Sequence, residues 1–152
     1  MTEVPGHSSP DDCANPDGDD ESLRPGPLWR HALWVVGVTI PGVGMGWFGA
    51  SFRFGPDEFG IPLAVPGQVW PYVAAWAVTG LTAAAALRAV AARVPLHGLE
   101  ALVILFTFVG TRLSLGHRPE PPVLGAMTAV VLTAAALWCG LALHRARRPM
   151  SG

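Results

Sequence analysis

The sequence predicts an all-α integral membrane protein: four transmembrane helices in an up-down bundle, preceded by a disordered acidic tail. Three runs contain no charged residue and no His, namely 32–52, 59–87 and 121–143. Each is long enough to cross the hydrocarbon core of a bilayer, which takes roughly 20 helical residues for ~30 Å. Open strands are excluded for such spans, because in hydrocarbon they would leave backbone groups without hydrogen-bond partners.

A fourth span requires a charged residue near each of its ends. The uncharged run 101–111 is too short to cross alone, and it becomes a span when Glu100 and Arg112 are included. The predicted helices are therefore 29–52, 69–92, 97–116 and 121–143, within a membrane domain at 28–144. The short links after the second and third helices force neighbouring helices to run antiparallel.

The two ends of the chain differ in composition from the membrane domain. Residues 1–27 hold seven of the eleven acidic residues and five prolines, with few apolar residues. Such a segment cannot bury enough apolar surface to fold, so we expect a disordered cytoplasmic tail. A short basic tail, 145–152, follows the last helix. The acidic tail and the net charge of −1 give no support to a nucleic-acid partner.

The arginines predict the orientation of the bundle. All ten basic residues are Arg, and seven lie on the side that carries both termini and the link between the second and third helices. Cytoplasmic segments carry the excess of basic residues, so we expect both termini in the cytoplasm and the protein in the cell membrane. The absence of Lys and the abundance of Ala, Gly, Pro and Arg point to a GC-rich, bacterial genome.

Aromatic residues are expected to form belts at the two membrane interfaces. On the predicted topology the inner belt consists of Trp29, Trp34 and Trp138. The outer belt consists of Trp47, Trp70, Tyr72 and Trp76. Anchoring at the headgroups explains all of them without a functional site.

The first helix contains a proline and several glycines. Pro41 lacks an amide hydrogen and frees the carbonyl of Gly37, which predicts a kink near the bilayer midplane. One interpretation is a broken helix in which the backbone at Pro41 and Gly42 lines a binding site, as in many transporters. The other interpretation is packing, because Gly42, Gly46 and Gly49 share one face at a spacing that lets two helices approach closely.

The third helix carries a polar stripe. Glu100, Thr107, Thr111 and Ser114 fall within about 60° of one another at ~100° per residue. An ionisable residue on such a stripe is a candidate for a ligand or ion pathway. The structural alternative places Glu100 in water at the interface or beside Arg93 or Arg88. The hydroxyls then bond to carbonyls of their own preceding turn.

The outer end of the third helix is basic. Arg112, His117 and Arg118 could form an outward basic patch that binds a lipid phosphate or an anionic ligand. Simple snorkelling of Arg112 to the headgroups explains the same residue without a site. Three nearby acidic residues, Glu120, Asp57 and Glu58, could instead neutralise these arginines.

The fourth helix is rich in small residues on one face, at Gly125, Ala129 and Gly140. Small residues allow close helix contact in a membrane. The contact could be made within the bundle or with another subunit, and the sequence leaves both open.

The sequence contains no nucleophile paired with a base, no phosphate-binding loop and no metal-ligand cluster, so we expect neither an enzyme nor a bound cofactor. We predict a non-catalytic membrane subunit or accessory protein that packs through small-residue helix faces. Its partners would be the bilayer and either a second copy or a larger membrane protein. The alternative is a small oligomeric transporter or channel that uses a first helix broken at Pro41 and the stripe of Glu100, Thr107 and Thr111.

Overall fold

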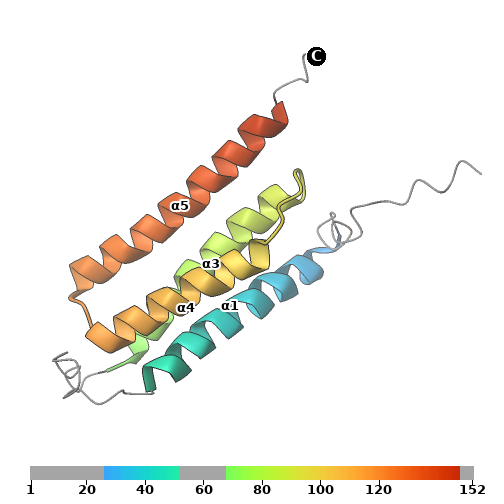
Figure 1. The fold of residues 1–152 in the computed structure, drawn as a ribbon. Helices are drawn as coiled ribbons and strands as arrows, with labels where there is room; N and C mark the ends of the chain where they lie inside the picture. The colour runs from blue at the N-terminus through green and yellow to red at the C-terminus, as the bar shows by residue number, and fades with distance from the viewer. Residues whose placement is uncertain (1–25, 52–67, 148–152) are drawn as a thin grey trace, which may run out of the picture.

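A computed structural model describes residues 26–51 and 68–147, and in these ranges the chain is entirely helical apart from short links. Its four helices are α1 (Leu28–Ser51), α3 (Trp70–Ala91), α4 (Leu99–His117) and α5 (Pro121–Arg147). Each is long and apolar enough to cross a membrane. The helices pack as a bundle (Figure 1), so the predicted fold class is confirmed.

The ends of the helices follow from local chemistry. Pro71 stands in the first turn of α3, where its missing amide hydrogen costs no helical bond. Gly98 precedes α4 with a φ of 73°, a left-handed conformation that glycine adopts without strain. Arg118, which follows the end of α4, also has a left-handed backbone conformation, with a φ of 44°. Its backbone N–H donates to the carbonyl of Ser114 at 2.8 Å. That bond satisfies a carbonyl that the end of the helix would leave free.

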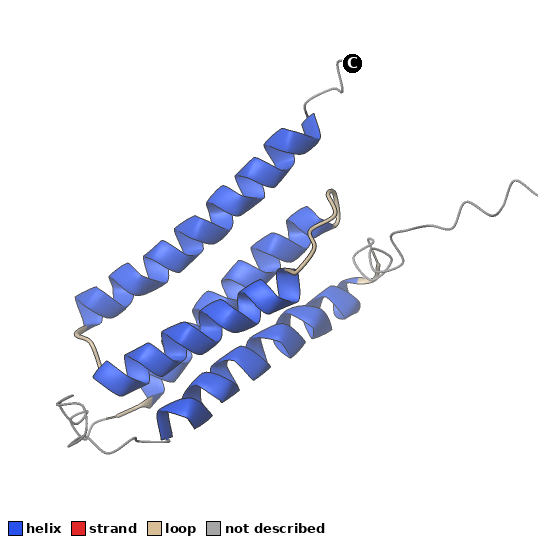
Figure 2. Cartoon of the chain, in the orientation of Figure 1, coloured by secondary structure: helices blue, strands red, loops and turns tan. Residues whose placement is uncertain are grey.

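Successive helices run antiparallel, so α1 and α4 run parallel and the beginning of α1 lies at the same end as the end of α5 (Figure 2). Helices α1, α3 and α4 contact one another, and the most extensive contact is between α1 and α4. Helix α5 lies mainly against α3 and touches α4 slightly. The bundle is therefore a three-helix core with a fourth helix on its outside.

The apolar core lies toward the end of the bundle where α1 begins. Its buried members come from α1, α3, α4 and the link between α3 and α4: Val38, Ala84, Leu87, Val90, Ala91, Leu96, Leu99 and Val103. Helix α5 has one buried residue among those described, Ala135. Most of the surface of α5 therefore faces outward, where a bilayer would cover it.

The predicted helix limits agree with the observed ones to within two residues, except that α5 continues to Arg147. The interpretation of α1 as a broken helix is wrong, since the helix runs from Leu28 to Ser51 with Pro41 inside it. Proline removes one hydrogen bond from the helical ladder, and the remaining bonds are retained because hydrocarbon offers no other partner. The acidic tail and most of the predicted outer link lie outside the described residues.

Candidate functional site

A close helix contact joins glycines of α1 to threonines of α4. A Cβ added to Gly46 would lie 2.6 Å from Thr111 Cβ and 2.8 Å from the Phe108 carbonyl oxygen. A Cβ added to Gly42 would overlap the hydroxyl of Thr107. The two glycines and the two threonines are each four residues apart, so one turn of α1 matches one turn of α4. Only glycine permits this backbone approach.

Helix α3 joins the same contact through Gly80. A Cβ at Gly80 would lie 2.5 Å from Thr107 Cγ2 and 2.8 Å from Thr39 Cγ2. Thr39 belongs to α1 and is buried with Thr107. The methyl groups of two threonines thus fill the space that a side chain on α3 would need, and three helices meet at Gly80.

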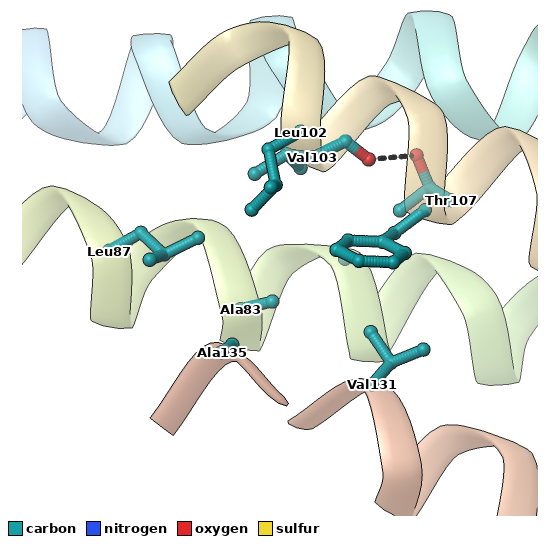
Figure 3. Close-up of a pocket in the computed structure, with 9 residues that line it drawn as sticks. Ala83, Leu87, Leu102, Val103, Thr107, Val131 and Ala135 are labelled. Atoms are coloured by element: carbon teal, nitrogen blue, oxygen red, sulfur yellow. Dashed lines mark hydrogen bonds between the residues drawn. The ribbon is translucent and has the colours of Figure 1, made fainter. Parts of the chain in front are cut away.

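Most of the threonine hydroxyl groups at this junction donate hydrogen bonds to carbonyls of their own helices. Thr107 donates to the Val103 carbonyl at 2.7 Å (Figure 3), and Thr39 donates to the Val35 carbonyl at 2.8 Å. These are the back-bonds that threonine makes to the preceding turn. Thr111 is different, because its side chain is 0% exposed and its hydroxyl has no hydrogen-bond partner among the described residues.

Ser114 completes the buried part of the stripe by bonding to α3. The indole N–H of Trp76 donates to Ser114 Oγ at 2.7 Å, and the Trp76 ring covers Gly110. Trp76 is 1% exposed, so its assignment to the outer interfacial belt is wrong. Its helical spacing with Thr79, Gly80 and Ala83 was a sequence signal that this tryptophan faces the bundle.

Glu100 lies apart from the buried hydroxyls. Glu100 is exposed, whereas Thr107, Thr111 and Ser114 are buried. The reason is position, because α4 begins at Leu99 and Glu100 stands in its first turn, where the positive end of the helix favours a carboxylate. The stripe predicted from helical angles is therefore buried from Thr107 to Ser114 and exposed at Glu100, near the beginning of α4.

Pro41 also faces away from the site. Both Pro41 and Gly37 are exposed, and nothing lies within 4 Å of a Cβ placed on Gly37. The carbonyl that Pro41 leaves without its helical partner therefore belongs to a residue on the outside of the bundle. Gly42 lies on the inward face, against Thr107, so the structure separates the two residues that the pathway interpretation combined.

A small apolar cavity lies between α3, α4 and α5 (Figure 3), with a volume of about 10 Å³. Its lining is contributed by Gly80, Ala83, Leu87, Leu102, Val103, Phe106, Thr107, Val131 and Ala135. A cavity of this size is at the limit for a single water molecule, and water needs polar partners that this lining scarcely supplies. The Thr107 hydroxyl points back to its own helix, so the cavity offers no polar route through the bundle.

A buried arginine lies at the other end of the bundle and was missed as a site residue. Arg88 is 5% exposed, and its Nε donates to His31 Nδ1 of α1 at 3.0 Å. The guanidinium lies over the Trp34 ring, 5.1 Å from its centroid. The Gly26 N–H approaches the other His31 nitrogen at 3.3 Å, and a neutral imidazole can accept only one of these bonds. The bond from Arg88 is the shorter of the two and its donor is a buried cation, so we assign the hydrogen bond to Arg88.

From the sequence, Arg88 is one of the seven arginines that predict the orientation and a possible partner of Glu100. A signal for its burial was present, because Arg88 lies only about 40° around the helix from the small residue Ala84, at ~100° per residue. Its stacking on Trp34 and its bond to His31 tie the first turns of α1 to the last turn of α3. Such contacts stabilise a charge that hydrocarbon alone would strongly disfavour.

The predicted outward basic patch is brought to one end of the bundle, at the end of α4. His117 is exposed, and Arg118 is half-buried in the left-handed turn that ends the helix. Arg112 is also half-buried and lies against Gly49 of α1 and Gly116 of α4. Gly49 thus accommodates an arginine side chain, in contrast to Gly42 and Gly46, which contact threonines.

The small residues predicted as a packing face on α5 are exposed. Gly125, Ala129 and Gly140 have no cover from the rest of the described chain, and nothing lies within 4 Å of a Cβ at either glycine. The part of α5 that contacts the bundle centres on Ala135 instead. The structure therefore leaves this face available for a contact outside the chain.

The four apolar helices define a multi-pass membrane protein with a polar junction in its core and one arginine seated near each end. Among the described residues no group of three His, Cys, Asp or Glu side chains is arranged to hold a metal ion. Comparison with family models, curated proteins and solved structures finds no match.

The α1 and α4 contact gives a matched pair of substitutions. Gly46→Ala places a methyl group against Thr111 and a backbone carbonyl, and such overpacking costs about 1–3 kcal/mol. Gly44→Ala on the same helix meets nothing within 4 Å and should be neutral or slightly stabilising. Reversible unfolding in mixed detergent micelles measures both. Equal stability of the two variants would show that the close approach does not hold the bundle together.

The contact of His31 with Arg88 can be tested by a double-mutant cycle. His31→Leu removes an acceptor from a buried cation, so we expect a loss of about 1.5–3 kcal/mol in the free energy of unfolding. In an Arg88→Leu background the same change should cost at least about 1 kcal/mol less. His117→Leu, at an exposed position, is the control and should change stability by no more than about 0.5 kcal/mol. Additive effects of the two substitutions would argue against the bond.

Proposed function

We propose that this chain is a non-catalytic membrane subunit or accessory protein that associates with another membrane protein, or with a second copy, through α5. The observation that carries the proposal is the exposure of the α5 small-residue face at Gly125, Ala129 and Gly140. These residues lie within about 60° of one another at ~100° per residue. They would allow the backbone of a partner helix to approach closely.

The interior of the bundle supports the same proposal. Thr107 and Ser114, which sequence analysis considered for a pathway, take part in helix contacts. Glu100 stands at an exposed helix end. Tight packing at Gly42, Gly46 and Gly80 leaves little room for a solute. A subunit role requires no such room.

The basic residues support a location in the cell membrane with both termini in the cytoplasm. Within the described residues, the end where α1 begins and α5 finishes carries Arg30, Arg88, Arg93, Arg145 and Arg147. The opposite end carries Arg112 and Arg118. This imbalance is the one that the positive-inside bias associates with the cytoplasmic side.

The proposal is tested by affinity purification of the tagged chain from its native membranes in a mild detergent. We expect a membrane partner or a second copy at fixed stoichiometry, and its loss in the variant Gly125→Leu with Gly140→Leu. Gly44→Leu, at an exposed glycine of α1, is the matched control and should keep the partner. A chain that purifies alone as a monomer, or a partner retained by the double variant, would count against an α5 interface.

A second candidate function, transport of an ion, is favoured by one observation, the fully buried Thr111 hydroxyl without a described partner. Such a group could contact an ion during a conformational change. If so, Thr111→Val or Glu100→Gln should abolish proton or potassium flux into liposomes that contain the purified protein, while leaving its folding unchanged. Absence of flux in the wild-type protein would remove this candidate. The packing proposal predicts that absence.

A further inference from the structure

Arg112 lies in a trough made by two glycines from two different helices. A Cβ added to Gly49 of α1 would lie 3.4 Å from Arg112 Cδ and 3.7 Å from Nε. A Cβ added to Gly116 of α4 would lie 3.2 Å from Arg112 Nη1. The side chain therefore lies close along both glycines, where larger residues would push it away. The two glycines therefore define the position of the Arg112 guanidinium at this end of the bundle.

The trough belongs to a face of α4 that is turned toward the lipid. Leu105 lies about 20° from Arg112 around the helix at ~100° per residue, and it is 57% exposed. Val109, about 60° away, is also exposed. Arg112 stands five residues before the end of α4 at His117, which is about 7–8 Å at ~1.5 Å per residue. An arginine at this depth reaches the headgroup level with its long side chain.

The charge of Arg112 is not neutralised within the described chain. Its guanidinium makes no hydrogen bond or ion pair with a described residue. Glu120, an acidic residue at the same end, is exposed and forms no ion pair with it. A half-buried guanidinium beside hydrocarbon is costly unless water, a polar group or an anion contacts it, and an anion gives the strongest contact. Among the described residues no carboxylate contacts it, and at this depth and on this face the phosphate of a lipid is an anion within its reach.

We infer that Arg112, seated between Gly49 and Gly116, binds the phosphate of an anionic phospholipid headgroup at this end of the bundle. Two N–H groups of the planar guanidinium can bond to two phosphate oxygens at once, which gives both strength and orientation. Arg118 and His117, at the end of the same helix, add positive charge around the site. This inference concerns the opposite end of the bundle from Arg30, Arg145 and Arg147 and does not depend on the α5 interface.

The test measures binding of phosphatidylglycerol to the purified full chain in detergent by native mass spectrometry. Arg112→Gln should weaken binding by about tenfold or more, the loss expected for hydrogen bonds to a charged group. Arg93→Gln is the matched control, since it removes one exposed arginine at the opposite end and should change binding much less. Inorganic phosphate, added as a competitor, should not displace the lipid.

Two further variants keep the test decisive if Arg112→Gln does not fold. Gly49→Leu fills the trough while leaving the charge in place, and it should also weaken lipid binding. Arg112→Lys keeps the charge without the planar pair of donors and should fall between wild type and Arg112→Gln. Wild-type affinity in the Arg112 and Gly49 variants would overturn the inference. Displacement of the lipid by inorganic phosphate would assign the site to a soluble anion instead and overturn the lipid assignment.

Discussion

The bundle depends on the close approach of α1 to α4, in which Gly42 and Gly46 contact Thr107 and Thr111. Between helices in a membrane there is no hydrophobic driving force, because lipid tails are as apolar as leucine. Stability must come from van der Waals contact and from hydrogen bonds, and both increase as backbones come together. The four-residue repeat on each helix brings them together along two turns. Helix α3 then completes the core through Gly80, which fits against the two threonine methyl groups.

The same contact explains why polar residues occur in the middle of this protein. A threonine presents a methyl group for packing and bonds its hydroxyl to its own helix, as Thr107 does with Val103. Trp76 serves in a similar way, since its ring covers Gly110 and its N–H bonds to Ser114. Polar side chains at helical spacing are therefore compatible with a close-packed interior. In this bundle most of them hold helices together, and Thr111 is the member whose hydroxyl has no such described role.

The lengths and limits of the helices could be predicted from the sequence because the bilayer sets them. Charge-free runs identified three spans, the third helix required Glu100 and Arg112 inside its ends, and Gly98 and Pro121 lie close to the predicted limits. The faces were harder to predict, because a membrane helix is apolar on its inner and outer sides alike. Gly42 and Gly125 carry the same small-residue signal, yet one lies in the core and the other is exposed. Which glycine meets a neighbour depends on the arrangement of the helices, and that is tertiary information.

The two seated arginines illustrate two ways of keeping a charge at the edge of a membrane. Arg88 is enclosed by protein, with His31 as an acceptor and the face of Trp34 beneath it, so it stabilises the junction of α1 with α3. Arg112 lies in a trough on the lipid side, and no described residue accepts a hydrogen bond from it. The charge of Arg88 is stabilised by side chains that the fold brings to it, whereas the charge of Arg112 is stabilised by the bilayer. Since α5 supplies neither the glycine–threonine core nor the trough of Arg112, a partner could bind the small-residue face of α5 without disturbing either. The architecture thus separates a close-packed core of α1, α3 and α4 from a helix whose outward face is available for contacts outside the chain.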